Sequence, residues 1–190
     1  MSQKNKLRLA ILVHHGGTQT NLKAIKEAVD AGKINAEISV VIPDTDEIMP
    51  ILDKVSPDYI CLCGWKKIIP DDLLLKYPNK ILNLHPGLIP DDIDGIVKNP
   101  DGTDALWNKG MYAEKSIKKF LDQKATYAGS SIHFLTSDFD FGSVLGKTFE
   151  KIEVGDNVES LYQRLKKKEN QLYVEVLEKL TPCSMFNPRC

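Results

Sequence analysis

The stretch LRLAILVHH, residues 7–15, decides the fold class of this chain. It is a continuous run of mostly aliphatic residues, and a strand with this composition is typical of a sheet covered on both faces. The next stretch, residues 16–33, places apolar side chains at helical spacing, namely Leu22, Ile25, Ala28 and Val29. Gly32 suits the end of that helix. A strand followed directly by a helix predicts a βαβ arrangement.

The alternation of strands and helices continues as far as residue 85. Further strands are expected in AEISVVIP (36–43), DYICLCGW (58–65) and ILNLH (81–85). Short helices are expected over 46–55 and 70–77. Strands that alternate with helices form parallel pairs. The pattern therefore predicts an α/β fold with a Rossmann-like, mostly parallel sheet and flanking helices.

Beyond Pro90 the pattern changes. Residues 91–104 are rich in Asp, Gly and Pro, which predicts a surface loop. A helix is expected over 113–121, and two strands lie in 129–136 and 143–154. The two strands are joined by the short turn SDFDFG, so they predict an antiparallel addition to the sheet in the C-terminal half.

The last predicted element is a long helix over residues 158–180. Asp156 as N-cap, with Glu159 three residues on, resembles a capping box. The apolar stripe of this helix consists of Val158, Leu161, Tyr162, Leu165, Leu172, Tyr173, Val176, Leu177 and Leu180. Glu169 falls inside the stripe. Because a buried carboxylate is costly unless it is paired, Glu169 is a candidate functional residue.

Composition excludes several classes of partner. The chain has 190 residues, 42% of them hydrophobic and 27% charged, and a formal net charge of -1. This length favours a single domain spanning residues 1–190. The charge disfavours broad binding to nucleic acid or to an anionic membrane. No apolar run approaches the ~20 residues that cross a bilayer, and the N-terminus is unlike a signal peptide. Small-molecule partners are expected.

The cysteines indicate a reducing compartment. None of the four forms a CxxC pair, and Cys61 and Cys63 lie within an apolar run. They are interpreted as small buried hydrophobic residues of a strand. A disulfide framework or a zinc site is not favoured, and a cytoplasmic location is expected. Cys183 and Cys190 lie near the C-terminus.

The end of the first predicted strand offers a possible anion site. Gly16 and Gly17 allow close backbone approach, and Thr18, Thr20 and Asn21 add side-chain donors just before a helix N-terminus. The pattern is neither GxGxxG nor a P-loop. A phosphate site and a plain tight turn both fit this stretch. The histidines that precede it, at positions 14 and 15, have no evident partner.

A second polar group interrupts the strand in ILNLHPGLIP. Asn83 and His85 are two residues apart, so they point to the same face at the carboxyl end of a parallel strand. Ligands bind at that edge in open α/β sheets. The alternative is a buried amide and imidazole satisfied by backbone. The later turn TSDFDFG offers two carboxylates, Asp138 and Asp140, for which turn formation is the simpler role.

Together these motifs resemble the folate-dependent formyltransferases, most closely the branch that acts on phosphoribosylglycinamide. That family has Asn-x-His-Pro at a strand end, here NLHPGLIP, and an Asp in a glycine-bearing loop after a later strand, here SSIHFLTSDFDFG. The register from His133 places Asp140, and not Asp138, at the catalytic position. The C-terminal helix and the stretch GGTQTNLKAI also match family motifs, so the resemblance covers nearly the whole chain.

The resemblance implies a reaction and a set of catalytic residues. A formyl group would pass from 10-formyltetrahydrofolate, a co-substrate, to the primary amine of glycinamide ribonucleotide in de novo purine synthesis. Asn83 would hydrogen-bond the formyl oxygen, and protonated His85 would stabilise the developing oxyanion. Asp140 would keep His85 charged and relay the amine's proton through water. No metal is implied.

The resemblance also assigns two binding regions. The substrate phosphate and ribose would contact Gly17, Thr18, Gln19, Thr20, Asn21 and Glu169. The folate pocket would be lined by Gly64, Trp65, Lys67 and Ile68, together with Asn83, Asp140 and the backbone of the 137–141 turn.

Several departures from the family pattern bear on the acceptor. Gly87 replaces the usual Ser after His-Pro, Lys66 and Lys67 replace an apolar residue and an Arg, and Gln19 replaces a phosphate-loop Gly. One βα unit is missing after residue 43, and NPDGTDALWNKG is an insertion. Other interpretations are therefore an N-formyltransferase for another amine, such as a nucleotide-linked amino sugar, and a non-catalytic folate- or nucleotide-binding module. A monomer or a homodimer is compatible with the sequence.

Overall fold

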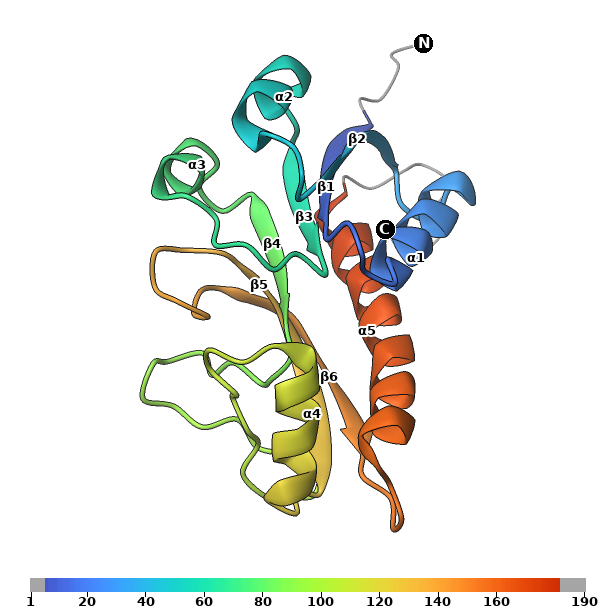
Figure 1. Ribbon diagram of the computed structural model, residues 1–190, viewed down its shortest axis with the longest axis vertical. Helices are drawn as coiled ribbons and strands as arrows, with labels where there is room; N and C mark the ends of the chain where they lie inside the picture. Colours follow the sequence, from blue (N-terminus) through green and yellow to red (C-terminus); the bar gives the residue numbers. More distant parts are fainter. Residues whose placement is uncertain (1–5, 182–190) are drawn as a thin grey trace.

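A computed structural model of the chain describes residues 6–181. Its centre is a six-stranded sheet with the order β2-β1-β3-β4-β5-β6. The strands are β1 (Leu7–Val13), β2 (Ala36–Pro43), β3 (Tyr59–Cys63), β4 (Ile81–His85), β5 (Tyr127–Phe134) and β6 (Val144–Lys151), seen across the middle of Figure 1. Neighbouring pairs among β1 to β4 are parallel. Strand β5 runs antiparallel to both of its neighbours, β4 and β6. The predicted fold class is confirmed.

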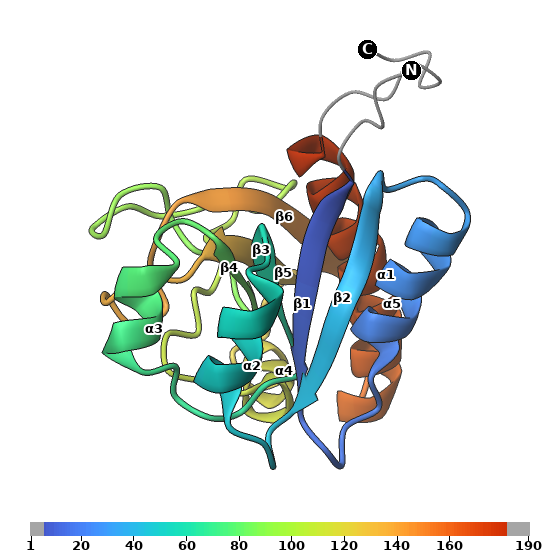
Figure 2. The same ribbon diagram turned by 90° about the horizontal axis from the view of Figure 1, so that it is seen from above.

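Helices cover both faces of the sheet. The helices are α1 (Thr20–Asp30), α2 (Ile48–Val55), α3 (Asp71–Lys76), α4 (Ala113–Asp122) and α5 (Val158–Leu180). Figure 2 shows α1 and α5 on one side of the sheet and α2 and α3 on the other. Five helices were expected at these places, and their bounds differ from the predicted ones by a few residues at most.

The apolar run of β1 faces two hydrophobic cores. Leu9 and Ile11 pack into the core under α1 and α5, whereas Ala10 and Leu12 pack into the core under α2 and α3. All four are fully buried. Because successive strand residues point to opposite faces, a strand between two helical layers must be apolar at every position. The continuous run in the sequence reflects this burial.

Helix α5 spans the predicted residues, but its N-cap lies one residue later than the sequence predicts. The N-cap is Asn157, whose side chain accepts a hydrogen bond from the Ser160 N–H, while the Ser160 hydroxyl accepts from the Asn157 N–H. The prediction of Asp156 as N-cap with Glu159 as its partner is wrong. Asp156 instead binds Arg164, and the ion pair Oδ2 to Nη2 is 2.6 Å long. An ionic partner eight residues further along the chain engages the carboxylate instead.

A long connection joins β4 to α4. Residues 86–112 form it, and their ordered structure includes an isolated antiparallel bridge between Lys98 and Asp104. The predicted surface loop of residues 91–104 lies within this connection. Its later part lies against its own beginning, because the Leu88 N–H donates to the Leu106 carbonyl at 3.0 Å.

Two further observations concern the described residues. Within residues 6–181 no helix is both long enough and apolar enough to cross a membrane. Cys61 and Cys63 are buried free thiols of β3, as expected, and burial raises the pKa of Cys63 to about 12. Cys183 and Cys190 lie outside the described residues.

Candidate active site

A cavity of about 610 Å3 opens at the carboxyl edge of the parallel strands. The chain runs from β1 outward to β2 and then returns to the opposite side of β1 as β3, so the strand order reverses here. Such a reversal is the usual place for a ligand in an open α/β sheet. The cavity is lined by every residue that the sequence nominates: Gly17, Thr18, Gln19, Thr20, Asn21, Gly64, Trp65, Lys67, Ile68, Asn83, His85, Asp140 and Glu169.

The amide of Asn83 is oriented by a buried histidine. Antiparallel pairing of β4 with β5 places Asn83 opposite His133, and Asn83 Nδ2 lies 3.1 Å from His133 Nε2. His133 Nδ1 lies 3.0 Å from the Phe134 carbonyl, which can only accept, so Nδ1 carries the proton and Nε2 accepts from Asn83. Burial, followed by the neighbouring charge of His85, lowers the pKa of His133 to about 4. A neutral His133 therefore fixes the Asn83 amide.

His85 is held between a carboxylate and a backbone carbonyl. Its Nδ1 lies 3.5 Å from Asp140 Oδ1, and its Nε2 lies 2.7 Å from the Trp107 carbonyl. The side chain is 2% exposed. Because a carbonyl oxygen can only accept, Nε2 must carry a proton. Asp138, by contrast, is exposed and does not line the cavity. The structure thus brings Asp140, and not Asp138, next to His85.

Asp140 occupies a constrained turn. Its φ is 50°, in the left-handed region, and one carboxylate oxygen accepts from the Gly110 N–H at 2.7 Å. Burial alone would raise the pKa of this carboxyl, but the hydrogen bond and charge of His85 and the Gly110 N–H outweigh it, and the pKa of Asp140 is lowered. An ionised carboxylate beside His85 is the state that this environment favours.

The opposite end of the cavity is formed by the loop before α1. Gln19 is the N-cap of α1 with φ 52°, and no side chain caps the helix. Thr20 Oγ1 and Asn21 Nδ2 are buried and have no hydrogen-bond partner among the described residues. Free backbone N–H groups at a helix N-terminus, with unpaired polar side-chain atoms beside them, form a site suited to an anion.

Glu169 projects from α5 toward this loop and is paired. It is 4% exposed, and its Oε1 accepts from the Ser130 hydroxyl at 2.6 Å. Its Oε2 lies 3.1 Å from Lys166 Nζ, which also donates to Asn21 Oδ1 at 2.8 Å. The Lys166 ammonium therefore lies between Glu169 and the loop. Although Lys166 belongs to the charged run RLKKK, residues 164–168, its side chain is only 16% exposed and lines the cavity.

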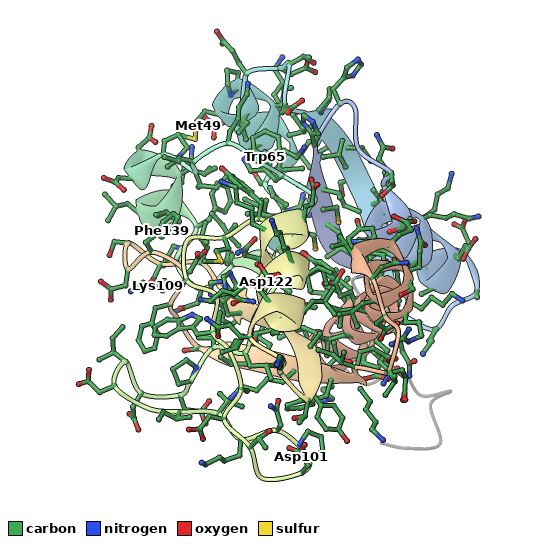
Figure 3. All side chains as sticks on the ribbon, turned by 60° about the horizontal axis from the view of Figure 1, so that its bottom comes forward. Met49, Trp65, Asp101, Lys109, Asp122 and Phe139 are labelled. Carbon is green, nitrogen blue, oxygen red and sulfur yellow. The ribbon has the colours of Figure 1, made fainter. Side chains whose placement is uncertain are left out.

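The residues of the predicted folate wall also line the cavity. Trp65 follows β3, and its Nε1 is buried without a partner among the described residues. Ile68 is 85% exposed, and Phe139, from the turn after β5, is 61% exposed. Figure 3 labels Trp65 and Phe139, which come from two separate connections of the chain. Lys67 donates to the Asp44 carbonyl, so its ammonium is tied to the end of β2. An apolar, partly open wall of this kind suits a flat ring system.

His14 has a partner that the sequence does not reveal. Its Nδ1 lies 2.5 Å from Asp44 Oδ2, and the other carboxylate oxygen accepts from the His15 N–H at 2.9 Å. The hydrogen bond to His14 is the main reason that the pKa of Asp44 is lowered. The parallel pairing of β1 with β2 brings these residues together. His14 lines the cavity beside the anion loop.

Among residues 6–181 no group of three or more His, Cys, Asp and Glu side chains is placed to hold a metal ion. The prediction that the site uses no metal stays a prediction.

A sequence model of the formyl transferase family matches residues 44–177, which include Asn83, His85, Asp140 and Glu169. This chain belongs to the formyl transferase family. A phosphoribosylglycinamide formyltransferase of Arabidopsis thaliana, a chloroplastic protein, is 26% identical over 92% of the chain. The chain spans 65% of the length of that relative.

Solved structures of a transformylase and of a deformylase share the fold. Glycinamide ribonucleotide transformylase 1 of Symbiobacterium toebii superposes with a TM-score of 0.76 at 23% identity, over 93% of this chain and 88% of that one. A formyltetrahydrofolate deformylase of Pseudomonas syringae gives a TM-score of 0.74 at 13% identity, over 92% of this chain and 61% of that one. At these identities the similarity shows that the chain shares their fold, and nothing more.

Proposed function

We propose that this chain transfers a formyl group from 10-formyltetrahydrofolate to the primary amine of glycinamide ribonucleotide, a step of de novo purine synthesis. One observation carries the proposal: a single cavity joins an anion-binding end to the group Asn83, His85 and Asp140. A phosphorylated amine with its phosphate at one end would present its amino group at the other. The curated relatives named phosphoribosylglycinamide formyltransferase support the same substrate.

The anion end suits a ribose phosphate. The phosphate would accept hydrogen bonds from backbone N–H groups of residues 18–21 and from the Thr20 hydroxyl, with the Lys166 ammonium supplying charge. Glu169 would accept from ribose hydroxyl groups, since carboxylate oxygens only accept. The 10-formyltetrahydrofolate ring would lie against Trp65 and Ile68.

The catalytic end suits formyl transfer. The amine nitrogen would attack the formyl carbon, and the carbonyl oxygen would gain negative charge. Asn83 Nδ2 has a second N–H that can donate to that oxygen while the first binds His133. A protonated His85 would stabilise the same charge. As the bond from carbon to the folate nitrogen breaks, Asp140 would pass the proton lost by the amine, through water, toward that leaving nitrogen.

Further parts of the proposal concern the whole protein. The chain would form one catalytic domain over residues 1–190, act on small molecules alone, and exist as a monomer or homodimer. The cytoplasmic location stays a prediction, and some curated relatives are chloroplastic proteins.

The test is an assay of the purified protein with 10-formyltetrahydrofolate and three acceptor conditions: glycinamide ribonucleotide, a nucleotide-linked amino sugar, and no amine. Tetrahydrofolate release and the formylated product are measured by absorbance and mass spectrometry. We expect turnover with glycinamide ribonucleotide, and a loss of about 10³-fold in kcat in His85→Ala. The matched control is His15→Ala, because His15 is exposed.

Each other outcome would indicate a different function for this protein. Turnover with the amino sugar alone would overturn the proposed acceptor. Formate release without any amine would indicate hydrolysis, the activity named for the Pseudomonas syringae structure. Folate binding without turnover would indicate a binding module.

A further inference from the structure

The inserted β4–α4 connection contacts both members of the His85–Asp140 pair. Its residues 106–110, with the sequence LWNKG, are called here the 106–110 segment. The Trp107 carbonyl accepts from His85 Nε2 at 2.7 Å, and the Trp107 indole N–H donates to the Asp140 carbonyl at 3.1 Å. The Gly110 N–H donates to the Asp140 carboxylate at 2.7 Å. One short segment therefore binds His85 and both the backbone and the side chain of Asp140.

The 106–110 segment is itself anchored to the strand end that carries His85. Asn108 Nδ2 donates to the Pro86 carbonyl at 3.1 Å, and Asn108 is 2% exposed. The Trp107 ring packs at a tilt on Phe141, with ring centroids 5.8 Å apart. Lys109 Nζ lies 4.9 Å from the centre of the same ring. The contacts with Pro86 and Phe141 anchor the segment to two other parts of the chain, as a part that positions other groups must be.

Gly87 is explained by the same segment. A Cβ added at Gly87 would lie 1.8 Å from the Trp107 carbonyl oxygen and 3.0 Å from His85 Nε2. No rearrangement of a side chain relieves a contact with a backbone carbonyl. The family's usual Ser after His-Pro is therefore incompatible with the Trp107–His85 hydrogen bond, and the glycine and the insertion depend on each other.

We propose that Trp107 is a positioning residue, and that the inserted 106–110 segment sets the orientation of the catalytic His85–Asp140 pair. The proposal rests on the proposed function for its kinetic consequences, but not for its structural ones. The Trp107 carbonyl accepts a hydrogen bond from the Nε2–H of His85 and thereby keeps Nδ1 toward Asp140. The indole N–H and the Gly110 N–H hold Asp140 in its left-handed conformation.

Two variants test the two contacts separately. Gly87→Ser installs the residue usual in the family and displaces the Trp107 carbonyl from His85; we expect kcat to fall about 100-fold, since small misplacement of a catalytic group has effects of that size. Trp107→Phe keeps the ring against Phe141 but removes the indole donor to Asp140; we expect kcat to fall about 3- to 10-fold. KM for both substrates should change less than 2-fold in each.

The matched controls lie in the same connection. Gly102→Asn changes a glycine with no atom within 4 Å of an added Cβ, at a left-handed position that Asn tolerates. Ile96→Ala truncates a side chain that is 65% exposed. Both should keep the wild-type kcat. Thermal unfolding of every variant identifies any loss of kcat that comes from unfolded protein.

A second readout does not require activity. Imidazole 15N–1H correlation spectra of the resting protein report which ring nitrogen of His85 carries the proton. In the wild type Nε2 should carry a proton, and Gly87→Ser should change the His85 signals while leaving those of His15 unchanged. Unchanged His85 signals in folded Gly87→Ser would overturn the positioning role even if the wild type formylates no amine. Unchanged kcat in both variants of an active enzyme would overturn it equally.

Discussion

The two ends of the cavity are built differently. At the catalytic end the polar atoms bind one another: Asn83 binds His133, and His85 lies between Asp140 and the Trp107 carbonyl. At the anion end Thr20 Oγ1 and Asn21 Nδ2 are buried without a partner among the described residues. A buried polar atom without a partner costs about 1–3 kcal/mol.

This difference separates two tasks. Groups that stabilise developing charge must be oriented before the substrate arrives, because reorienting them during the reaction would raise the barrier. Groups that bind a substrate phosphate need only be complementary to it, and the ligand itself satisfies them when it binds. The fold therefore fixes the catalytic end internally and leaves polar atoms available at the anion end.

Replacing the carboxylate that contacts His85 is the largest perturbation of the catalytic end. Asp140→Asn keeps the side-chain shape but removes the charge 3.5 Å from His85 Nδ1. We expect kcat to fall about 10³-fold with little change in KM, because the carboxylate is needed for proton transfer and charge. Steady-state kinetics with both substrates measure this.

The matched control is Asp138→Asn, in the same turn but exposed to solvent. It should keep the wild-type kcat. Equal losses in the two variants would mean that the turn, and not the carboxylate at position 140, is what matters.

The burial of His133, together with the neighbouring charge of His85, makes stability depend on pH. The pKa of His133 is about 4 in the folded protein against an ordinary value of 6.5. Between these pH values the unfolded chain binds a proton that the folded chain does not, so the free energy of unfolding falls as pH falls. From pH 7 to pH 5 this contribution is about 2 kcal/mol.

Urea unfolding of wild type and His133→Gln at pH 7, 6 and 5 tests this. A Gln side chain can still accept from Asn83, but it does not titrate in this range. The variant should lose about 2 kcal/mol less than the wild type between pH 7 and pH 5. His15→Gln, at an exposed position, should follow the wild type. Parallel curves for all three proteins would show that His133 is not buried in the neutral form.

Much of this architecture could be predicted from local sequence, for a physical reason. A strand between two helical layers must be apolar throughout, so β1 and β3 are visible in the composition of single segments. Asn83 and His85 stand out because they interrupt such a segment, and Glu169 because it interrupts the stripe of α5. Each of these signals lies within one element.

The residues that sequence reasoning missed depend on contacts between distant elements. In the sequence, His133 only helped to align the family motif that contains Asp140. Its contact with Asn83 arises from strand pairing between residues 50 apart in the chain. His14 finds Asp44 only because β1 pairs with β2. Lys166 lies in a charged run of α5, and no local pattern distinguishes it from Lys167. The role of Gly87 depends on its close approach to the backbone of Trp107, twenty residues further along the chain.

At the anion end, Lys166 should matter for binding and not for the chemical step. Lys166→Gln keeps a donor for Asn21 and Glu169 but removes the charge. We expect KM for glycinamide ribonucleotide to rise about 30-fold, the effect of losing one charged hydrogen bond to a phosphate, with kcat within 3-fold. The control is Lys167→Gln, next along the helix and exposed. A fall in kcat at constant KM would contradict a role for Lys166 in phosphate binding and would indicate a role in the chemical step.

The smallest effects compare two buried hydroxyl groups, one from each end. The Ser131 hydroxyl, behind the catalytic end, donates to the Gly87 carbonyl and accepts from the Ile89 N–H, both at 2.9 Å. Ser131→Ala should lower the free energy of unfolding by about 1.5 kcal/mol, because it leaves both backbone groups unpaired.

Thr20→Val removes a buried hydroxyl that has no partner among the described residues. It should leave the free energy of unfolding unchanged or raise it by up to about 1 kcal/mol, while KM for glycinamide ribonucleotide rises about 3-fold. Urea unfolding of both variants and steady-state kinetics of Thr20→Val measure these three quantities. Equal destabilisation by both substitutions would contradict the contrast between a preorganised catalytic end and an anion end whose polar atoms are satisfied by the substrate.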